Sequence, residues 1–172
     1  MECARELIEQ AAAQGLRIDH LVTATGSTGT HAGLVAGLHA MGEALPVTGI
    51  SVRQPRERQI DAVHALAVRT AERLGASAPP RDAVRVDDGY VGAGYGVPAP
   101  STYEAISMAA RIEGLLLDPV YSGKGFAGLL GMIRAGVFGT GENIVFLHTG
   151  GAQALFAYES ALVANAGAVP AV

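Results

Sequence analysis

Hydrophobic positions along the 172-residue chain follow two different spacings. Small or apolar side chains recur every three to four residues, the period of an amphipathic helix, over 2–14, 30–41, 56–74, 102–113 and 124–135. Between them lie short, nearly continuous apolar runs, the pattern of strands that are buried on both faces, at 18–23, 47–52, 83–86 and 143–148. A further helix is predicted to end near residue 162.

Strands that alternate with helices predict an α/β fold. We expect a three-layer sandwich with a mostly parallel sheet and helices on both faces. The run 143–148 is the most apolar and is predicted to be the most buried strand. Ser101 and Glu104 have the spacing of a capping box for the helix 102–113. Loops that follow parallel strands meet at the carboxyl edge of the sheet, where such folds bind ligands.

Composition narrows the class of protein. The chain is 49% hydrophobic and 16% charged, with 23 glycines that cluster in the loops; ordinary domains carry roughly 25% charged residues. This composition excludes a disordered chain. Glycine-rich loops are typical of backbone that turns tightly or approaches a ligand.

Charge and cysteine usage point to a cytoplasmic protein. Twelve basic residues against sixteen acidic ones give a net charge of −4, and no basic stripe favours nucleic acid as a partner. Cys3 is the only cysteine, and the five histidines show no metal-ligand spacing. The amino terminus lacks the order of a signal peptide, and no apolar run approaches the roughly 18 residues of a membrane span.

The first candidate site is the segment Thr25, Gly26, Ser27, Thr28, Gly29 and Thr30, between a predicted strand and helix. A helix amino terminus offers unpaired N–H groups and the positive end of a dipole, so this loop is predicted to bind phosphate. The alternative is that its glycines only close a tight turn. Its spacing differs from Gly-x-Gly-x-x-Gly, and no P-loop lysine follows, which disfavours a dinucleotide or ATP.

Three later segments add candidate chemistry. Lys124, the only lysine, lies in the glycine-flanked stretch after Asp118; it can be a Schiff-base lysine or a surface or capping cation. His148 ends the last predicted strand, and it can be either a hydrogen-bonded core histidine or a ligand contact. Tyr90 and Tyr95 lie in a glycine-rich loop and can serve the site or only pack.

Taken in order, four motifs resemble the D-cysteine desulfhydrase/1-aminocyclopropane-1-carboxylate deaminase family of pyridoxal 5′-phosphate enzymes, which have the tryptophan synthase β-like fold (fold type II). They are TGSTGTHAG at 25–33, GYGVP at 94–98, EGLLLDPVYSGK at 113–124 and HTGGA at 148–152. The resemblance runs from Val22 to Tyr158.

The resemblance implies a role for each motif. The loop 25–30 would hold the cofactor phosphate. Tyr121 and Tyr95 would be the catalytic phenols at the substrate end of the cofactor, and Thr149, followed by Gly150, would place a neutral hydroxyl at the pyridine nitrogen. The cyclopropane deaminases resemble this chain but carry glutamate at the position of Ser122 and leucine at that of Thr149, so the resemblance favours the desulfhydrase side.

The implied reaction is α,β-elimination on a small amino acid. D-cysteine, giving pyruvate, ammonia and hydrogen sulfide, is the first choice; L-cysteate releasing sulfite and the cyclopropane deaminase reaction are the alternatives. A non-catalytic phosphate-ligand binding remnant is the alternative from another class.

The family also implies a longer chain that works as a homodimer, with its Schiff-base lysine in a part preceding these residues. Residues 1–172 are therefore interpreted as the C-terminal part of the large cofactor-binding domain, incomplete and inactive without the lysine-bearing half.

Overall fold

The computed structural model describes residues 2–165. Helices and strands alternate for most of the chain. In order they are α1 (Glu2–Ala13), β1 (His20–Thr25), α2 (Gly29–Ala40), β2 (Val47–Ser51), α3 (Arg56–Arg73), the 3-10 turn η1 (Arg81–Ala83), β3 (Val84–Asp87), α4 (Pro100–Glu113), α5 (Ser122–Arg134), β4 (Ile144–Leu147), η2 (Ala152–Tyr158) and α6 (Glu159–Asn165).

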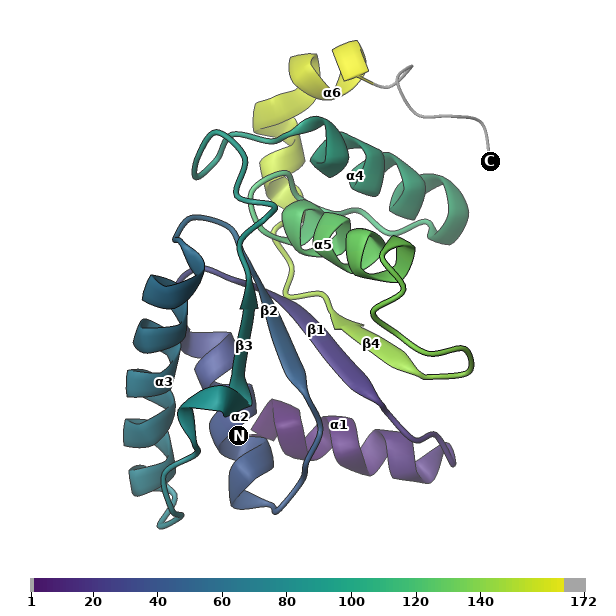
Figure 1. The fold of residues 1–172 in the computed structure, drawn as a ribbon. Coiled ribbons are helices and arrows are strands. Elements are labelled where there is room, and N and C mark those ends of the chain that lie inside the picture. Colours follow the sequence, from purple (N-terminus) through teal and green to yellow (C-terminus); the bar gives the residue numbers. More distant parts are fainter. Residues whose placement is uncertain (1, 166–172) are drawn as a thin grey trace.

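The four strands form one parallel sheet in the order β3-β2-β1-β4 (Figure 1). Leu21 of β1 lies opposite Val47 of β2 and Val145 of β4. Because every strand runs the same way, the segments that follow β1, β2, β3 and β4 all leave from one edge. The predicted α/β arrangement with a parallel sheet is confirmed.

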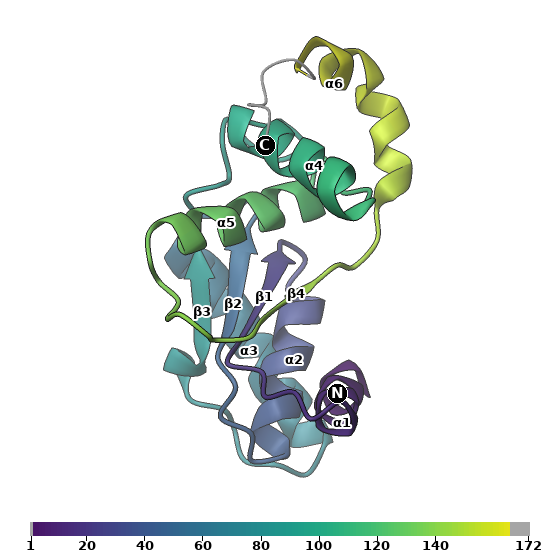
Figure 2. The same ribbon diagram turned by 90° about the vertical axis from the view of Figure 1, so that its right-hand side faces the viewer.

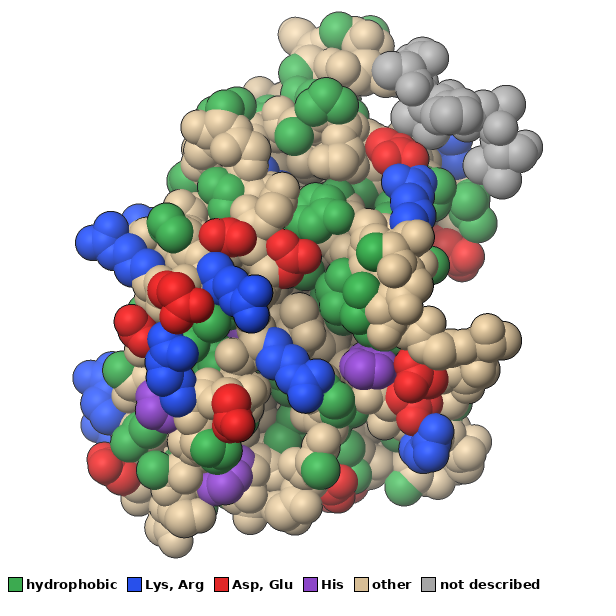
Figure 3. Space-filling view, in the orientation of Figure 1, with side chains coloured by type: hydrophobic (Ala, Val, Ile, Leu, Met, Phe, Trp, Pro, Cys, Tyr) green, Lys and Arg blue, Asp and Glu red, His purple; other side chains and the backbone are tan. Residues whose placement is uncertain are grey.

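Helices α1, α2 and α3 cover one face of the sheet, and α5 lies across the other with α4 packed outside it (Figure 2). The two faces have separate cores. Leu21 and Val84 pack with Leu34 and Val63 on the first face. Alternate strand residues point the other way and pack against α5, among them Val22 and Ile50 with Leu129. Figure 3 shows charged side chains gathered over α3 and hydrophobic ones over α5.

Helix α5 lies against β1 and β2 along a glycine face. A Cβ atom on Gly125 would come 3.1 Å from the Cβ of Ala24, and one on Gly128 would come 2.6 Å from side-chain atoms of Ile50. Only glycine lets the helix approach the sheet this closely. This close packing fixes where α5 begins, above the carboxyl edge of the sheet.

Strand β4 corrects one expectation. The run 143–148 was predicted to be the most buried strand, yet Ile144–Leu147 are only half-buried. β4 is a terminal strand of the described sheet, paired with β1 on one side. The apolar sequence of β4 is consistent with partial cover on both faces of the strand. An apolar sequence does not distinguish a central strand from a terminal one.

The start of α4 corrects another. Ser101 and Glu104 do not form the predicted capping box; α4 begins at Pro100, and the Thr102 hydroxyl accepts a hydrogen bond from the backbone N–H of Ala99 at 3.1 Å. Proline suits the first helical position because its φ is already fixed. Glu104 instead forms an ion pair with Arg134 of α5 at 2.6 Å.

Gly128→Ala is expected to lower the free energy of unfolding. The added methyl must displace Ile50, and the resulting strain outweighs the gain in helix propensity, for a net loss of about 1–2 kcal/mol. Gly29→Ala is the matched control, because a Cβ there meets nothing within 4 Å. Urea denaturation measures both; equal midpoints for the two variants would contradict close packing of α5.

Candidate functional site

The segment between β1 and α2 turns sharply at the carboxyl edge of the sheet. Thr28 has a φ of 69°, the left-handed region that threonine rarely adopts. Gly26 lies beneath Tyr121: a Cβ at Gly26 would sit 2.8 Å from Val52 Cγ2 and 3.1 Å from Tyr121 Cε1. The first N–H groups of α2 have no partner within the helix and point out of its amino terminus.

This segment lines a small cavity of about 70 Å³. Residues far apart in the sequence meet around it: Ala24, Thr25, Gly26, Ser27, Thr28, Thr30, His31, Tyr121 and Thr149. The structure thus brings the predicted phosphate loop together with one predicted phenol and with the hydroxyl after β4. Gly29, Gly150 and Ser122 are not among the lining residues.

Two buried side chains support the cavity, His31 as one of its lining residues and Gln59 through a bond to the lining residue Thr25. Gln59 of α3 donates from Nε2 to the Thr25 hydroxyl at 2.8 Å. His31 is 1% exposed, and neither of its ring nitrogens has a hydrogen-bond partner. Burial lowers the pKa of His31 to about 4, against a weaker opposing contact with the Val47 backbone. The imidazole is therefore neutral near pH 7, and its ring lies against Gly49, where no Cβ would fit.

Asp118 fixes the position of Tyr121. Its buried carboxylate accepts hydrogen bonds from the backbone N–H groups of Val120, Tyr121 and Ser122 at 2.7–2.8 Å. The Ser122 hydroxyl donates to the same carboxylate at 2.6 Å. A carboxylate at a helix amino terminus is favoured by the helix dipole. The Ser122 hydroxyl is thus engaged with Asp118, in the cap of α5.

The two predicted catalytic phenols lie side by side. The hydroxyl oxygens of Tyr95 and Tyr121 are 3.2 Å apart and hydrogen-bonded, with the rings edge to face at 5.8 Å. This hydrogen bond and then burial raise the pKa of Tyr121 to about 12. Arg53, two residues after the end of β2, has its guanidinium carbon 5.7 Å from the centre of the Tyr95 ring. Tyr121 is accordingly a protonated phenol near neutral pH.

Lys124 is not the surface or capping cation that the sequence allowed, and its amine is not free for the alternative, a Schiff base. Its side chain is fully buried, and Nζ donates to the backbone carbonyls of Val91 and Gly94 at 2.6 and 2.8 Å. Burial lowers its pKa. The amine is directed into the 88–96 loop and is not among the cavity-lining residues.

The remaining candidates lie elsewhere. His148 is exposed, so the interpretation as a core histidine is wrong. Tyr90 packs against the core beneath α5, while Tyr95, in the same loop, is 53% exposed. Gly150 is exposed with a φ of 90°. Among the described residues, no group of three or more His, Cys, Asp or Glu is arranged to hold a metal ion.

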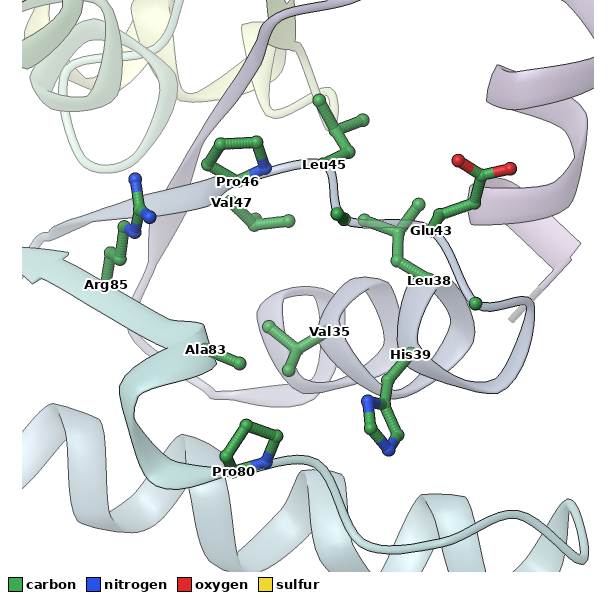
Figure 4. A pocket seen from close by; sticks show the side chains of 12 residues that line it. Val35, Leu38, His39, Glu43, Leu45, Pro46, Val47, Pro80, Ala83 and Arg85 are labelled. Carbon is green, nitrogen blue, oxygen red and sulfur yellow. The ribbon is translucent and has the colours of Figure 1, made fainter.

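A larger hollow of about 380 Å³ lies at the opposite, amino edge of the sheet (Figure 4). It is lined largely by apolar side chains, with Val35 of α2 lying between Pro46 and Pro80. His39, on its rim, is within hydrogen-bond distance of the Ser77 hydroxyl, at 3.1 Å. None of the predicted site residues lines this hollow, so size alone does not mark the site.

Comparison with known proteins identifies the family. The family described as pyridoxal-phosphate dependent enzyme matches residues 1–150. The chain belongs to this family. Its members depend on pyridoxal phosphate, so the cavity can be tested against that group.

Individual relatives agree with this assignment. The chain is 41% identical to a 1-aminocyclopropane-1-carboxylate deaminase of Burkholderia vietnamiensis, covering 90% of this chain and 46% of that protein. It is 40% identical to a D-cysteine desulfhydrase of Yersinia enterocolitica, covering 92% and 47%. A solved structure of an ACC deaminase homologue superposes with a TM-score of 0.82 at 34% identity, over 94% of this chain and 48% of that one. The chain spans about half the length of the curated relatives it matches.

The cavity fits the phosphate end of pyridoxal phosphate. The cavity lies at the amino terminus of α2. It is lined by Gly26, where a Cβ would collide with Val52, and by the buried imidazole of His31, whose nitrogens have no hydrogen-bond partner. Backbone N–H groups at a helix start are a recurring anion site.

Within residues 2–165, no helix is both long and apolar enough to cross a membrane.

Asp118, Gln59 and His31 are the residues that sequence reasoning missed as parts of the site. The Asp-Pro pair ahead of a helix was a signal for a cap, and it could have identified Asp118. Gln59 and His31 gave no such signal, because each occupies a helix whose rotation about its axis decides which side chains face the cavity.

Stability is expected to fall as the pH drops from 6.5 to 4. Below pH 6.5 the unfolded chain binds a proton at His31, while the folded protein keeps the imidazole neutral until about pH 4. His31 therefore contributes a loss of up to about 3 kcal/mol across that window, and none above it. In His31→Leu the slope of unfolding free energy against pH, measured in urea, should be shallower there. An unchanged slope would show that His31 is not buried neutral.

Proposed function

We propose that this chain forms the phosphate-binding and phenol-bearing side of the active site of a pyridoxal-phosphate-dependent lyase. The reaction is α,β-elimination on a small β-substituted amino acid, with D-cysteine as the first substrate. The observation that supports this most is the meeting of the 25–30 loop, Tyr121 and Thr149 around one cavity. Three segments distant in sequence converge there, as a cofactor site requires.

The residues of the chain have distinct tasks in this proposal. The N–H groups at the start of α2, with the hydroxyls of Ser27, Thr28 and Thr30, bind the phosphate. When bound, pyridoxal phosphate supplies the electron sink for the elimination. Thr149 offers a neutral hydroxyl to the pyridine nitrogen, and Gly150 lets the chain turn beside it. Tyr121 holds its proton near neutral pH, which suits it to donate that proton rather than to abstract one.

The choice of substrate within the family rests on the residues near the ring nitrogen. A carboxylate there would protonate the nitrogen, whereas in this chain the residue that lines the cavity after β4 is Thr149, and the Ser122 hydroxyl is bonded to Asp118. Identity to the deaminase and desulfhydrase relatives is nearly equal, 41% and 40%, so the overall likeness does not decide between them. Neutral hydroxyls favour D-cysteine, with L-cysteate next.

The Schiff-base lysine of this proposed enzyme lies outside residues 1–172. Lys124 is the only lysine in the sequence, and its amine is buried and bound to two backbone carbonyls. We therefore assign residues 1–172 to the C-terminal part of the cofactor-binding domain. The active enzyme also contains the lysine-bearing half and works as a homodimer.

Residues 1–172 alone should bind the cofactor phosphate without forming a covalent bond to it. Pyridoxal phosphate followed by borohydride is expected to give no reduced adduct at Lys124, by mass spectrometry of the peptides. Amide signals of 26–30 should shift on titration with pyridoxal phosphate, as seen by NMR. A reduced adduct at Lys124, or shifts confined to the opposite edge of the sheet, would contradict the assignment.

Joining this chain to the preceding half of the Yersinia enterocolitica relative should produce a lyase. We expect pyruvate and sulfide from D-cysteine, and a fall in kcat of at least about a hundredfold in Tyr121→Phe, the usual size of a proton-transfer contribution. Tyr103→Phe, at a tyrosine of α4 that does not line the cavity, is the matched control and should leave kcat unchanged.

Each other product has a clear meaning. If the fusion releases sulfite from L-cysteate and no sulfide from D-cysteine, the substrate is L-cysteate and the reaction class, α,β-elimination, is unchanged. α-Ketobutyrate from the cyclopropane substrate would overturn the interpretation of the hydroxyls. Cofactor binding with no turnover, and no effect of Tyr121→Phe on binding, would favour a non-catalytic phosphate-ligand module.

A further inference from the structure

Lys124 is the largest of the fully buried side chains in the described structure, and it is a cation. It lies in the first turn of α5, three residues after Tyr121. Nζ donates to the carbonyl of Val91 at 2.6 Å and to that of Gly94 at 2.8 Å. Both acceptors belong to the 88–96 loop, and Gly94 immediately precedes Tyr95.

An ammonium at this position is energetically unfavourable unless its hydrogen bonds are made. Burying a charged group costs several kcal/mol unless partners compensate. A methionine would fill similar space without that cost, so what lysine adds here is the pair of bonds to the loop. Burial lowers the pKa of Lys124, as expected for a desolvated amine.

The first part of the loop is held by the packing of Tyr90 against the core and by a hydrogen bond from the Val91 N–H to the Asp88 carbonyl. Around Tyr95 the backbone makes fewer such contacts, among them the Val97 N–H to the Gly94 carbonyl at 3.2 Å. Gly92, Gly94 and Gly96 all have positive φ values, so the backbone of this loop is intrinsically free to move. Tyr95 is 53% exposed and is therefore not fixed by burial. On the far side of Tyr95, the Tyr158 hydroxyl donates to the Gly96 carbonyl at 2.7 Å. The loop is thus bound on both sides of Tyr95, and Lys124 supplies two of these bonds.

We propose that Lys124 is a positioning residue, which ties the Val91–Gly94 backbone to the start of α5 and so holds Tyr95 within hydrogen-bond reach of Tyr121. One helical turn then carries both the phenol and the group that brings the second phenol to it. The anchoring of the loop by Lys124 does not depend on the proposed function, whereas its effect on turnover rests on that function.

Lys124→Met should release the loop without unfolding the protein. Chymotrypsin is expected to cut after Tyr90 and Tyr95 at least about tenfold faster, since a lost hydrogen bond to a charged group is worth that factor or more. Ile60→Val, in the core beneath α3, is the control: it lowers global stability but leaves the loop bonds in place. Equal acceleration in both variants would show that Lys124 only adds stability.

A spectroscopic measurement separates positioning from stability. In fluorotyrosine-labelled protein, fluorine NMR follows the ionisation of each phenol. Lys124→Met should lower the pKa of Tyr121 by the same amount as Tyr95→Phe, because both remove the bond that raises it. Ile60→Val should leave that pKa unchanged. A Tyr121 pKa that falls in Tyr95→Phe but not in Lys124→Met would overturn the proposal.

The unsubstituted chain provides a test that does not depend on the variant folding. Lys124 is the only lysine, so reductive methylation can modify only its amine and the α-amino group. Lys124 should stay unmodified in the native chain and react fully in urea. Rapid methylation under native conditions would show that the amine is not held by the loop.

The fusion enzyme links the anchor to turnover. Lys124→Met and Tyr95→Phe should each lower kcat with little change in KM. The kcat of the double variant should equal that of the less active single variant. Additive losses would refute a shared role. An unsubstituted fusion enzyme without lyase activity would refute the proposed function, while the proteolysis and NMR results would still decide the anchoring.

Discussion

The close approach of α5 to the sheet is the constraint on which the site depends. Gly125 and Gly128 leave no room for a Cβ against Ala24 and Ile50, so the helix cannot sit farther along or be rotated without opening a gap or a clash. Its first turn is thereby fixed above Gly26. Both Tyr121 and Lys124 belong to that region, and their positions follow from the packing of a helix face that carries no functional group.

The ionised groups around the cavity are occupied in holding its architecture. The Asp118 carboxylate accepts four hydrogen bonds at the cap of α5, and the Lys124 ammonium is bound to two loop carbonyls. What faces the cavity is neutral: hydroxyls, backbone N–H groups and the His31 imidazole. An anion entering it meets oriented dipoles rather than a fixed cation, which is the way helix amino termini bind phosphate.

Much of the fold followed from the periodicity of the sequence, and so did the edge at which the site lies. Continuous apolar runs predicted parallel strands, and loops after such strands must share an edge. Two features could not be predicted in this way. The apolar run 143–148 gave no sign that β4 is terminal, because burial of a strand's faces and pairing of its edges are separate properties. The cap of α4 depended on whether Pro100 or Ser101 began the helix, and both choices satisfy local rules.

The roles of individual polar residues depended on side-chain direction. Ser122 and Thr149 are both hydroxyls in motifs of the resemblance, yet one is bound to Asp118 within a helix cap and the other reaches the cavity. The sequence allowed Lys124 to be a Schiff-base lysine or a surface or capping cation, whereas in the fold its amine is buried and bound to two loop carbonyls. Sequence spacing identifies which loops meet, but the rotation of α5 about its axis decides which of its side chains serve the site.

The loop 25–30 contains one strained residue, which the surrounding structure holds in place. Thr28, at a φ of 69°, is in a backbone region that costs threonine about 1–3 kcal/mol. The surrounding structure holds it there: Ala32 donates its N–H to the Thr28 carbonyl at 2.8 Å, and Gln59 donates to the hydroxyl of Thr25, where the loop begins. Because the cost is met in the folded chain before any ligand arrives, the N–H groups of the loop are already in place. In the proposed site, an anion would therefore bind without first having to order the backbone that receives it.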